Sequence, residues 1–292
     1  MPQARTSGMA REVVATGDAS SVLDRAGAFL EGDPVRHNVI LTLLQARAAS
    51  REPGRYWIAS DDGHVCGVVF QSPLSFVATI TPMDASTVDA VVVAIATAGV
   101  LLPGVSGDAA TAARFAGAWT ERHTTGARPE QGQRIYEIVT VEPVVGVSGR
   151  LRQAVEADRL RLLAWLRGFY DDTGEGGGDP ERAVAHRVAA GQLWLWDHDG
   201  PVSMAAVTAP AAGVARIQTV YTPPELRKRG YASACVAQLS ADTVTAGSRC
   251  VLYTDLGNPT SNSIYRRIGY EAVAEVLRYR FDGRSQAAAA SP

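Results

Sequence analysis

Residues 223–232 read PPELRKRGYA, with three consecutive basic residues followed by a glycine. The alternating, β-branched segment 217–222 (IQTVYT) comes directly before them and is typical of a strand. Apolar residues at helical spacing follow the turn, and these are Ala232, Cys235, Val236, Leu239 and Val244. The stretch therefore predicts a strand, a basic turn with a glycine, and a helix.

This basic turn suits a phosphate-bearing ligand. A helix that begins just after Gly230 directs its unpaired N–H groups and the positive end of its dipole at the turn. Gly230 allows a close backbone approach or a positive φ, while Lys228 and Arg229 add positive charge. Together these features favour a pyrophosphate. A solvated basic loop explains the turn equally well when it is considered alone.

A second motif follows about 30 residues later, on the next strand–helix unit. Residues 258–270 read NPTSNSIYRRIGY. The first motif, R-x-x-G-x-A, consists of Arg227, Gly230 and Ala232. The second, N-x₆-Y-x₃-G-Y, consists of Asn258, Tyr265, Gly269 and Tyr270. In this order, the two motifs resemble those of the GCN5-related N-acetyltransferase (GNAT) superfamily. The resemblance covers residues 148–283.

The resemblance implies that acetyl-CoA is the co-substrate. It implies main-chain bonds from a splayed strand to the pantetheine arm and acetyl group, through Val220, Tyr221 and Thr222. It implies a loop that surrounds the pyrophosphate, formed by Arg227, Lys228, Arg229, Gly230, Tyr231 and Ala232, with the hydroxyl of Ser233 beside it. The side chains of Asn258 and Asn262 are implied to contact the pantetheine.

Tyr265 matches the tyrosine that protonates the departing CoA thiolate in this superfamily. A phenol suits this role because its pKa, near 10, lies above that of a thiol, so that it stays protonated and can donate. A core aromatic residue without a catalytic role is the alternative interpretation of Tyr265. Many members carry a glutamate that acts as the general base on the strand before the loop, but Arg216 and Gln218 occupy that region here. We therefore assign no general base, and Glu225, Asp255 and water remain open.

An internal repeat indicates two domains. Two alternating segments surround an Asp-Gly pair, which is a hairpin signal. Trp57, Asp62-Gly63 and Val65 in the first match Trp194, Asp199-Gly200 and Val202 in the second. Helical stretches then end at Ala98-Gly99 and Ala246-Gly247, and strands that end in aspartate follow at 102–108 and 250–255.

The sequence thus predicts an α/β protein with mixed sheets, built as two tandem GNAT-like acyltransferase domains at 10–143 and 148–283. Two closing strands are expected near 271–281. The tail 284–292 is low in complexity and is expected to be disordered. Such tandem arrangements are similar to those of actinobacterial relatives of mycothiol synthase.

The first domain lacks both motifs and is expected to be degenerate. Its segment 81–87 (TPMDAST) is acidic and has no glycine where the phosphate loop should recur. If Asp108 corresponds to Asp255, Thr111 replaces Asn258 and Ala118 replaces Tyr265. We expect this domain to bind no CoA and to act as a wall or lid for the acceptor.

Composition excludes several other classes of protein. The 292 residues carry a formal net charge of −2, which argues against a general nucleic-acid binder. The apolar runs are shorter than the ~20 residues of a membrane span. The five histidines are scattered and the three cysteines form no CxxC pair, so that no metal site and a reducing, cytoplasmic compartment are expected. A generic nucleotide-binding protein lacks support because neither GxGxxG nor GxxxxGK[ST] occurs.

The resulting hypothesis is an acetyl-CoA-dependent N-acetyltransferase that acts on a primary amine of an unidentified small molecule or peptide. A non-catalytic acyl-CoA-binding or sensor protein is the alternative, and Tyr265 argues against it because binding alone needs no proton donor. No nucleic acid or membrane partner is expected. The oligomeric state is left open, with a homodimer as one option.

Overall fold

The computed structural model describes residues 11–50, 52–174 and 178–282, so that the expected disorder of the tail 284–292 lies outside the described residues. Contacts divide the chain into two units. The first comprises Met1–Gln133 with Ala274–Pro292, and the second comprises Arg134–Val273. None of the helices in the described ranges is long and apolar enough to cross a membrane.

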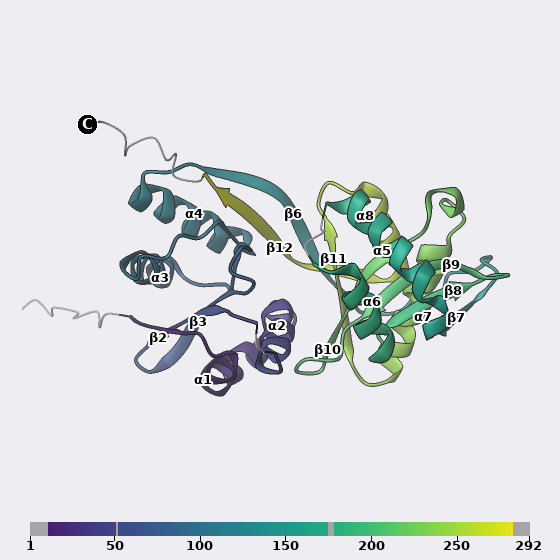
Figure 1. Cartoon of the computed structure of the whole chain (residues 1–292), viewed down its shortest axis with the longest axis horizontal. Helices are drawn as coiled ribbons and strands as arrows, with labels where there is room; N and C mark the ends of the chain where they lie inside the picture. The colour runs from purple at the N-terminus through teal and green to yellow at the C-terminus, as the bar shows by residue number, and fades with distance from the viewer. Residues whose placement is uncertain (1–10, 51, 175–177, 283–292) are drawn as a thin grey trace, which may run out of the picture. The chain divides into compact units, whose positions relative to one another are not determined.

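The first copy of the fold contains ten elements in chain order (Figure 1). They are β1 (Glu12–Thr16), α1 (Ala19–Gly32), α2 (Asn38–Ala48), β2 (Arg55–Asp61), β3 (His64–Gln71), β4 (Ala78–Ile80), α3 (Ala85–Thr97), β5 (Gly104–Asp108), α4 (Ala109–His123) and β6 (Ala127–Ile138). Strands β1 to β5 are hydrogen-bonded neighbours in that order.

The second copy repeats this order of strands and α-helices. Its elements are β7 (Arg150–Gln153), α5 (Arg159–Thr173), α6 (Pro180–Ala189), β8 (Leu193–Asp197), β9 (Pro201–Val207), β10 (Val214–Tyr221), α7 (Tyr231–Thr245), β11 (Arg249–Asp255), α8 (Pro259–Ile268) and β12 (Tyr270–Phe281). Short 3₁₀ turns lie at Glu156–Asp158 and Pro224–Leu226. The repeated order confirms the expectation of two similar α/β domains.

Both Asp-Gly turns place the aspartate and the glycine at positive φ. Asp62 and Asp199 have φ values of 49° and 55°, and the glycines that follow also have positive φ. Positive φ at both central residues is the requirement of a type I′ turn, whose twist matches that of the flanking strands. The Asp-Gly pairs therefore specify the β2–β3 and β8–β9 hairpins from local sequence alone.

The units do not divide at the positions 10–143 and 148–283 expected from the sequence. Segment 134–143 lies in the second unit, where Glu142 N donates to Ile268 O at 2.8 Å. Segment 274–282 lies in the first unit, where β12 pairs antiparallel with β5 from Val276–Asp108 to Arg280–Gly104. The expectation of two closing strands near 271–281 is wrong, since β12 is one continuous strand, drawn in olive in Figure 1.

Helices cover both faces of the sheet in the second unit. One face packs against α7 and α8 through Ala205, Ile217, Leu239, Leu252 and Tyr265. The opposite face packs against α5 and α6 through Leu162, Leu166, Val184, Leu195 and Met204. In the first unit, α3 and α4 form a corresponding core with Trp57, Val69, Val91, Phe115 and Trp119. These layers fix the junction of β10 with α7, where the sequence predicts the ligand site.

Candidate functional site

Strands β10 and β11 part before either one ends. Their parallel pairing runs from Val214–Arg249 to Ile217–Leu252, whereas β10 continues to Tyr221 and β11 to Asp255. We call the point just beyond Ile217 and Leu252 the fork. Among the described residues, β11 has no pair with β10 beyond the fork. The main-chain edge of β10 that would pair with β11 at Val220 and Tyr221 can therefore bond to a ligand.

A β-bulge shapes β10 at the fork. The register with β9 shifts between Gln218 and Tyr221, and Thr219 has a φ of 54°, which is unusual for a β-branched residue. The end of the strand is held by Ser203, whose hydroxyl donates to the Tyr221 carbonyl at 3.0 Å and lies 2.9 Å from the Thr222 hydroxyl. The expected splayed strand is therefore present, with Thr222 buried as part of its support.

The N-terminus of α7 has no side-chain cap. Gly230 is its N-cap residue with a φ of 83°, and no side chain accepts a hydrogen bond there. The first-turn N–H groups of Tyr231, Ala232 and Ser233 have no partner inside the helix, so they are available to an anion. Lys228, also at positive φ, and Arg229 are exposed beside this helix end.

Two of the predicted loop residues have structural contacts of their own. The Tyr231 side chain is buried in the core, with its ring 5.8 Å from that of His198, so it offers a ligand only its main chain. Arg227 donates from Nε to the Thr222 carbonyl at 2.9 Å and forms an ion pair with Asp172 of α5. Arg227 therefore ties the loop to α5 and to the end of β10. The sequence pattern did not identify Asp172, since its partner lies 55 residues away.

The two predicted asparagines differ in their availability. Asn258 is exposed as the N-cap residue of α8, where its side chain accepts from Ser261 N at 3.0 Å. Asn262 is 6% exposed. Its amide nitrogen donates to the carbonyls of Asp255 and Asn258, and its Oδ1 accepts from the Tyr136 hydroxyl at 3.0 Å. These contacts use both donors of Asn262 within the protein, so they support a structural role and not the expected pantetheine contact.

Tyr265 combines burial with an uncommitted hydroxyl. Tyr265 is 9% exposed, and burial raises the pKa of its hydroxyl to about 12. Within the described residues, its hydroxyl has no hydrogen-bond partner. The hydroxyl of the neighbouring Tyr270, in contrast, lies 2.7 Å from Ser240 Oγ and 3.3 Å from Cys250 Sγ. Tyr265 thus remains protonated at neutral pH and can donate to a ligand.

The fork carries two arginines where many members of the superfamily have a glutamate that acts as the general base. The Arg216 guanidinium lies 5.6 Å from the centre of the Tyr253 ring, and Arg187 of α6 donates to the Thr219 hydroxyl at 3.1 Å. Of the carboxylates left open by the sequence, Glu225 is exposed, and Asp255 accepts from Gly257 N at 2.7 Å. The geometry therefore assigns no general base. Arg187 was missed because α6 meets the fork only in the folded chain.

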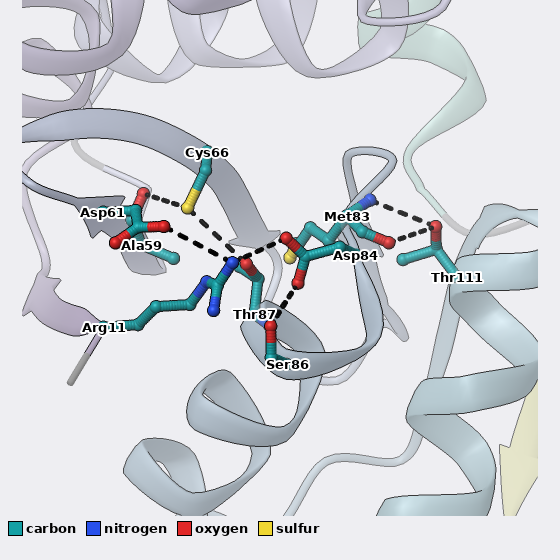
Figure 2. A network of polar contacts seen from close by, with 9 residues as sticks. All are labelled: Arg11, Ala59, Asp61, Cys66, Met83, Asp84, Ser86, Thr87 and Thr111. Carbon is teal, nitrogen blue, oxygen red and sulfur yellow. Dashed lines mark hydrogen bonds and ion pairs between the residues drawn. The ribbon is translucent and has the colours of Figure 1, made fainter. Parts of the chain in front are cut away.

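The corresponding helix of the first unit is capped by its own carboxylate. Figure 2 shows Asp84, the N-cap residue of α3, facing Arg11 and Ser86. Asp84 accepts from Thr87 N at 2.8 Å and from Ser86 Oγ at 2.7 Å, and it pairs with Arg11 at 2.7 Å. These bonds, led by that from Thr87, lower its pKa to about 2. A carboxylate therefore lies where a phosphate would bind in the second unit.

Strands β4 and β5 of the first unit form no fork within the described residues. Strands β4 and β5 stay paired up to Ile80–Gly107, the last and penultimate residues of the two strands. Beyond them, the Thr111 hydroxyl accepts from Met83 N at 3.2 Å and donates to Met83 O at 3.4 Å (Figure 2). The ends of the two strands are thereby joined by protein groups.

The helix caps also correct the expected correspondence between the copies. Asp108 caps α4 as Asn258 caps α8, so the residue that corresponds to Asn258 is Asp108 and not Thr111. Tyr265 lies seven residues after Asn258, and the residue seven after Asp108 is Phe115, not Ala118. Phe115 is fully buried in the core of the first unit. The first copy thus retains an aromatic ring at this position without the hydroxyl.

Known proteins share both the sequence pattern of the site and the fold. Residues 197–279 match the family model described as FR47-like protein. No curated protein sequence matches the chain. Within residues 11–50, 52–174 and 178–282, no group of three or more His, Cys, Asp or Glu side chains could hold a metal ion.

Three solved structures resemble nearly the whole chain. A GNAT-family acetyltransferase from Colwellia psychrerythraea is 10% identical with a TM-score of 0.62, covering 93% of this chain and 100% of its own. A GCN5-related N-acetyltransferase from Sphaerobacter thermophilus is 17% identical with a TM-score of 0.58, covering 92% and 95%. A tandem GNAT protein from the clavulanic acid biosynthesis pathway is 10% identical with a TM-score of 0.58, covering 94% and 100%. This chain therefore has the fold of the GCN5-related N-acetyltransferase superfamily in two tandem domains, and residues 197–273 of its match to the FR47-like family lie in the second unit.

Proposed function

We propose that this protein transfers the acetyl group of acetyl-CoA to a primary amine, and that the second unit carries out the reaction. One observation carries the proposal: the N-terminus of α7 is left without a side-chain cap beside the fork, at Gly230. At the corresponding helix of the first unit, Asp84 supplies the cap. Among the described residues, the second unit combines a helix end open to an anion with strands that part, and the first unit does not.

The proposed binding mode uses main-chain groups and local positive charge. The N–H groups of Tyr231, Ala232 and Ser233 would receive the pyrophosphate, with Lys228 and Arg229 beside it. The free edge of Val220 and Tyr221 would pair with the pantetheine arm. Such contacts need no particular side chains on β10, so Arg216 and Gln218 on this strand remain compatible with the co-substrate.

In the proposed reaction, the neutral amine attacks the thioester carbonyl carbon and the carbon–sulfur bond breaks. A main-chain N–H near Val220 would stabilise the negative charge that develops on the carbonyl oxygen. Tyr265 would give its proton to the leaving thiolate, and solvent would reprotonate the phenolate. The proton that the attacking nitrogen loses from the tetrahedral intermediate would pass to water, since no carboxylate is assigned as base.

Activity is tested directly with the full-length chain, acetyl-CoA and a panel of primary amines, followed by mass spectrometry. The proposal predicts a product that is heavier by one acetyl group, and strongly reduced formation of it by Tyr265→Phe. Binding of CoA without transfer to any amine would favour the alternative of a sensor. The uncommitted hydroxyl of Tyr265 argues against that alternative, because binding alone does not require a proton donor.

A further inference from the structure

Two arginines meet at the fork of the second unit. Arg216 lies on β10, one residue before the last pair with β11, and its guanidinium contacts Tyr253, the first residue of β11 beyond the fork. Arg187 approaches from α6 and donates to the hydroxyl of Thr219 in the bulge. Both side chains are partly buried.

Their surroundings are unfavourable for two positive charges. Burial lowers the pKa of the Arg187 guanidinium, and burial together with the Arg187 charge lowers that of Arg216. The groups that counteract this are phenols, Tyr170 for Arg187 and Tyr253 for Arg216. No carboxylate in the described part of the chain forms an ion pair with Arg187. Because the pKa of a guanidinium lies far above neutral pH, both groups still carry their charge there.

The location ties this pair to the reaction. Thr219, the partner of Arg187, directly precedes Val220, where the main chain is proposed to hold the acetyl group. The pair lies on the opposite side of β10 from Ile217, which faces α7. Lys228 and Arg229 lie beside the end of α7 proposed for the phosphate, whereas Arg187 and Arg216 lie at the fork, beside the place proposed for the acetyl group.

We propose that the acceptor amine also carries an oxyanion, a carboxylate or a phosphate, which Arg187 and Arg216 bind at the fork. This inference rests on the proposed function, since it names the class of the amine. A guanidinium offers parallel N–H donors that match the two oxygens of either group. An anion between the two arginines would also remove their mutual repulsion.

The test uses the full-length protein and matched primary amines. ω-Amino acids are compared with their carboxamides, and aminoalkyl phosphates with the corresponding amino alcohols, so that only the distal charge differs. Both kcat/KM with acetyl-CoA and, by calorimetry, the Kd of each amine on the CoA-loaded protein are measured. The variants are Arg187→Gln, Arg187→Lys to retain the charge, and Arg182→Gln as an exposed control on the same helix.

We expect anionic amines to exceed their neutral partners by about 10- to 100-fold in kcat/KM, the range of a charge-assisted hydrogen bond. Arg187→Gln should remove this preference, Arg187→Lys should restore part of it, and Arg182→Gln should retain it. A preference for carboxylates or for phosphates would identify the oxyanion. The affinity for CoA should not change in Arg187→Gln.

The outcomes separate this inference from the proposed function. Acetylation of charged and neutral amines at equal rates would overturn the inference and leave the acetyltransferase proposal standing. Tighter binding of anionic amines that depends on Arg187, without any acetylation, would support the inference and overturn the acetyltransferase proposal. Loss of CoA affinity in Arg187→Gln would assign the guanidinium to a CoA phosphate and overturn the inference.

Discussion

Asp84 and Gly230 occupy the same position, the N-cap, of corresponding helices in the two copies of the fold. Asp84 supplies a carboxylate to the first turn of α3, whereas Gly230 supplies no side chain to α7. An N-terminal helix turn is stabilised by negative charge. In the first copy that charge is part of the chain, and in the second we infer that it comes from the ligand.

Asp84→Asn should destabilise the protein through the first unit. Loss of an N-cap residue costs about 1 kcal/mol, and asparagine, itself a good cap, will recover part of this, so Asp84→Ala should cost more. Because the pKa of Asp84 in the folded protein, about 2, lies below its ordinary value, the charged carboxylate stabilises the fold at pH values above the ordinary pKa. This contribution is lost as the pH falls towards 2. Urea unfolding between pH 7 and pH 3 measures the effect. A stability difference from Asp84→Ala that stays constant over this range would contradict the assignment.

Gly230→Val should weaken CoA binding at least ten-fold, or by about 1.4 kcal/mol. A Cβ at position 230 would meet Val147 Cγ2 at 2.7 Å, and the φ of 83° is unfavourable for valine, so the turn that presents the amides must shift. Calorimetry with CoA checks this. Gly247→Val is the matched control, because Gly247 lies at the other end of α7 with a φ of 87° and open space around it. Equal affinities in the two variants would remove the turn from the site.

Tyr265→Phe should lower kcat by about 10²-fold and leave the affinity for acetyl-CoA nearly unchanged. The ring and its packing remain, and only the uncommitted hydroxyl is lost. Tyr270→Phe serves as the control, since it deletes a buried hydroxyl that bonds to Ser240: it should lower the free energy of unfolding by about 1 kcal/mol without a comparable loss of kcat. Wild-type turnover by Tyr265→Phe would show that the thiolate is protonated by another group.

The sequence predicted the features that depend on neighbouring residues. The Asp-Gly hairpins and the helix after Gly230 are encoded within a few residues each, and the structure contains both. The repeat of Trp57 and Trp194 likewise reflects a shared pattern of alternation in two hairpins. These features were sufficient to identify the fold class.

Features that depend on contacts between distant residues were not visible in the sequence. The assignment of segments 134–143 and 274–282 to opposite units follows from sheet pairing, which joins β12 to β5 across more than half of the chain. Asn262 lies one turn after the motif residue Asn258, but its amide is used by Asp255, Asn258 and Tyr136, and the last of these lies 126 residues away. The partners of Arg187 and Arg227 were hidden for the same reason.

The most direct test of the account is the number of CoA molecules bound per chain, since the central claim is that one copy of the fold binds CoA and the other caps its own helix. Calorimetric titration of the full-length protein should give one equivalent of CoA. Gly230→Val should weaken that single event, whereas Asp84→Ala should leave both its affinity and its stoichiometry unchanged. Two equivalents of CoA in the wild-type protein, or one that is lost in Asp84→Ala and retained in Gly230→Val, would contradict the account.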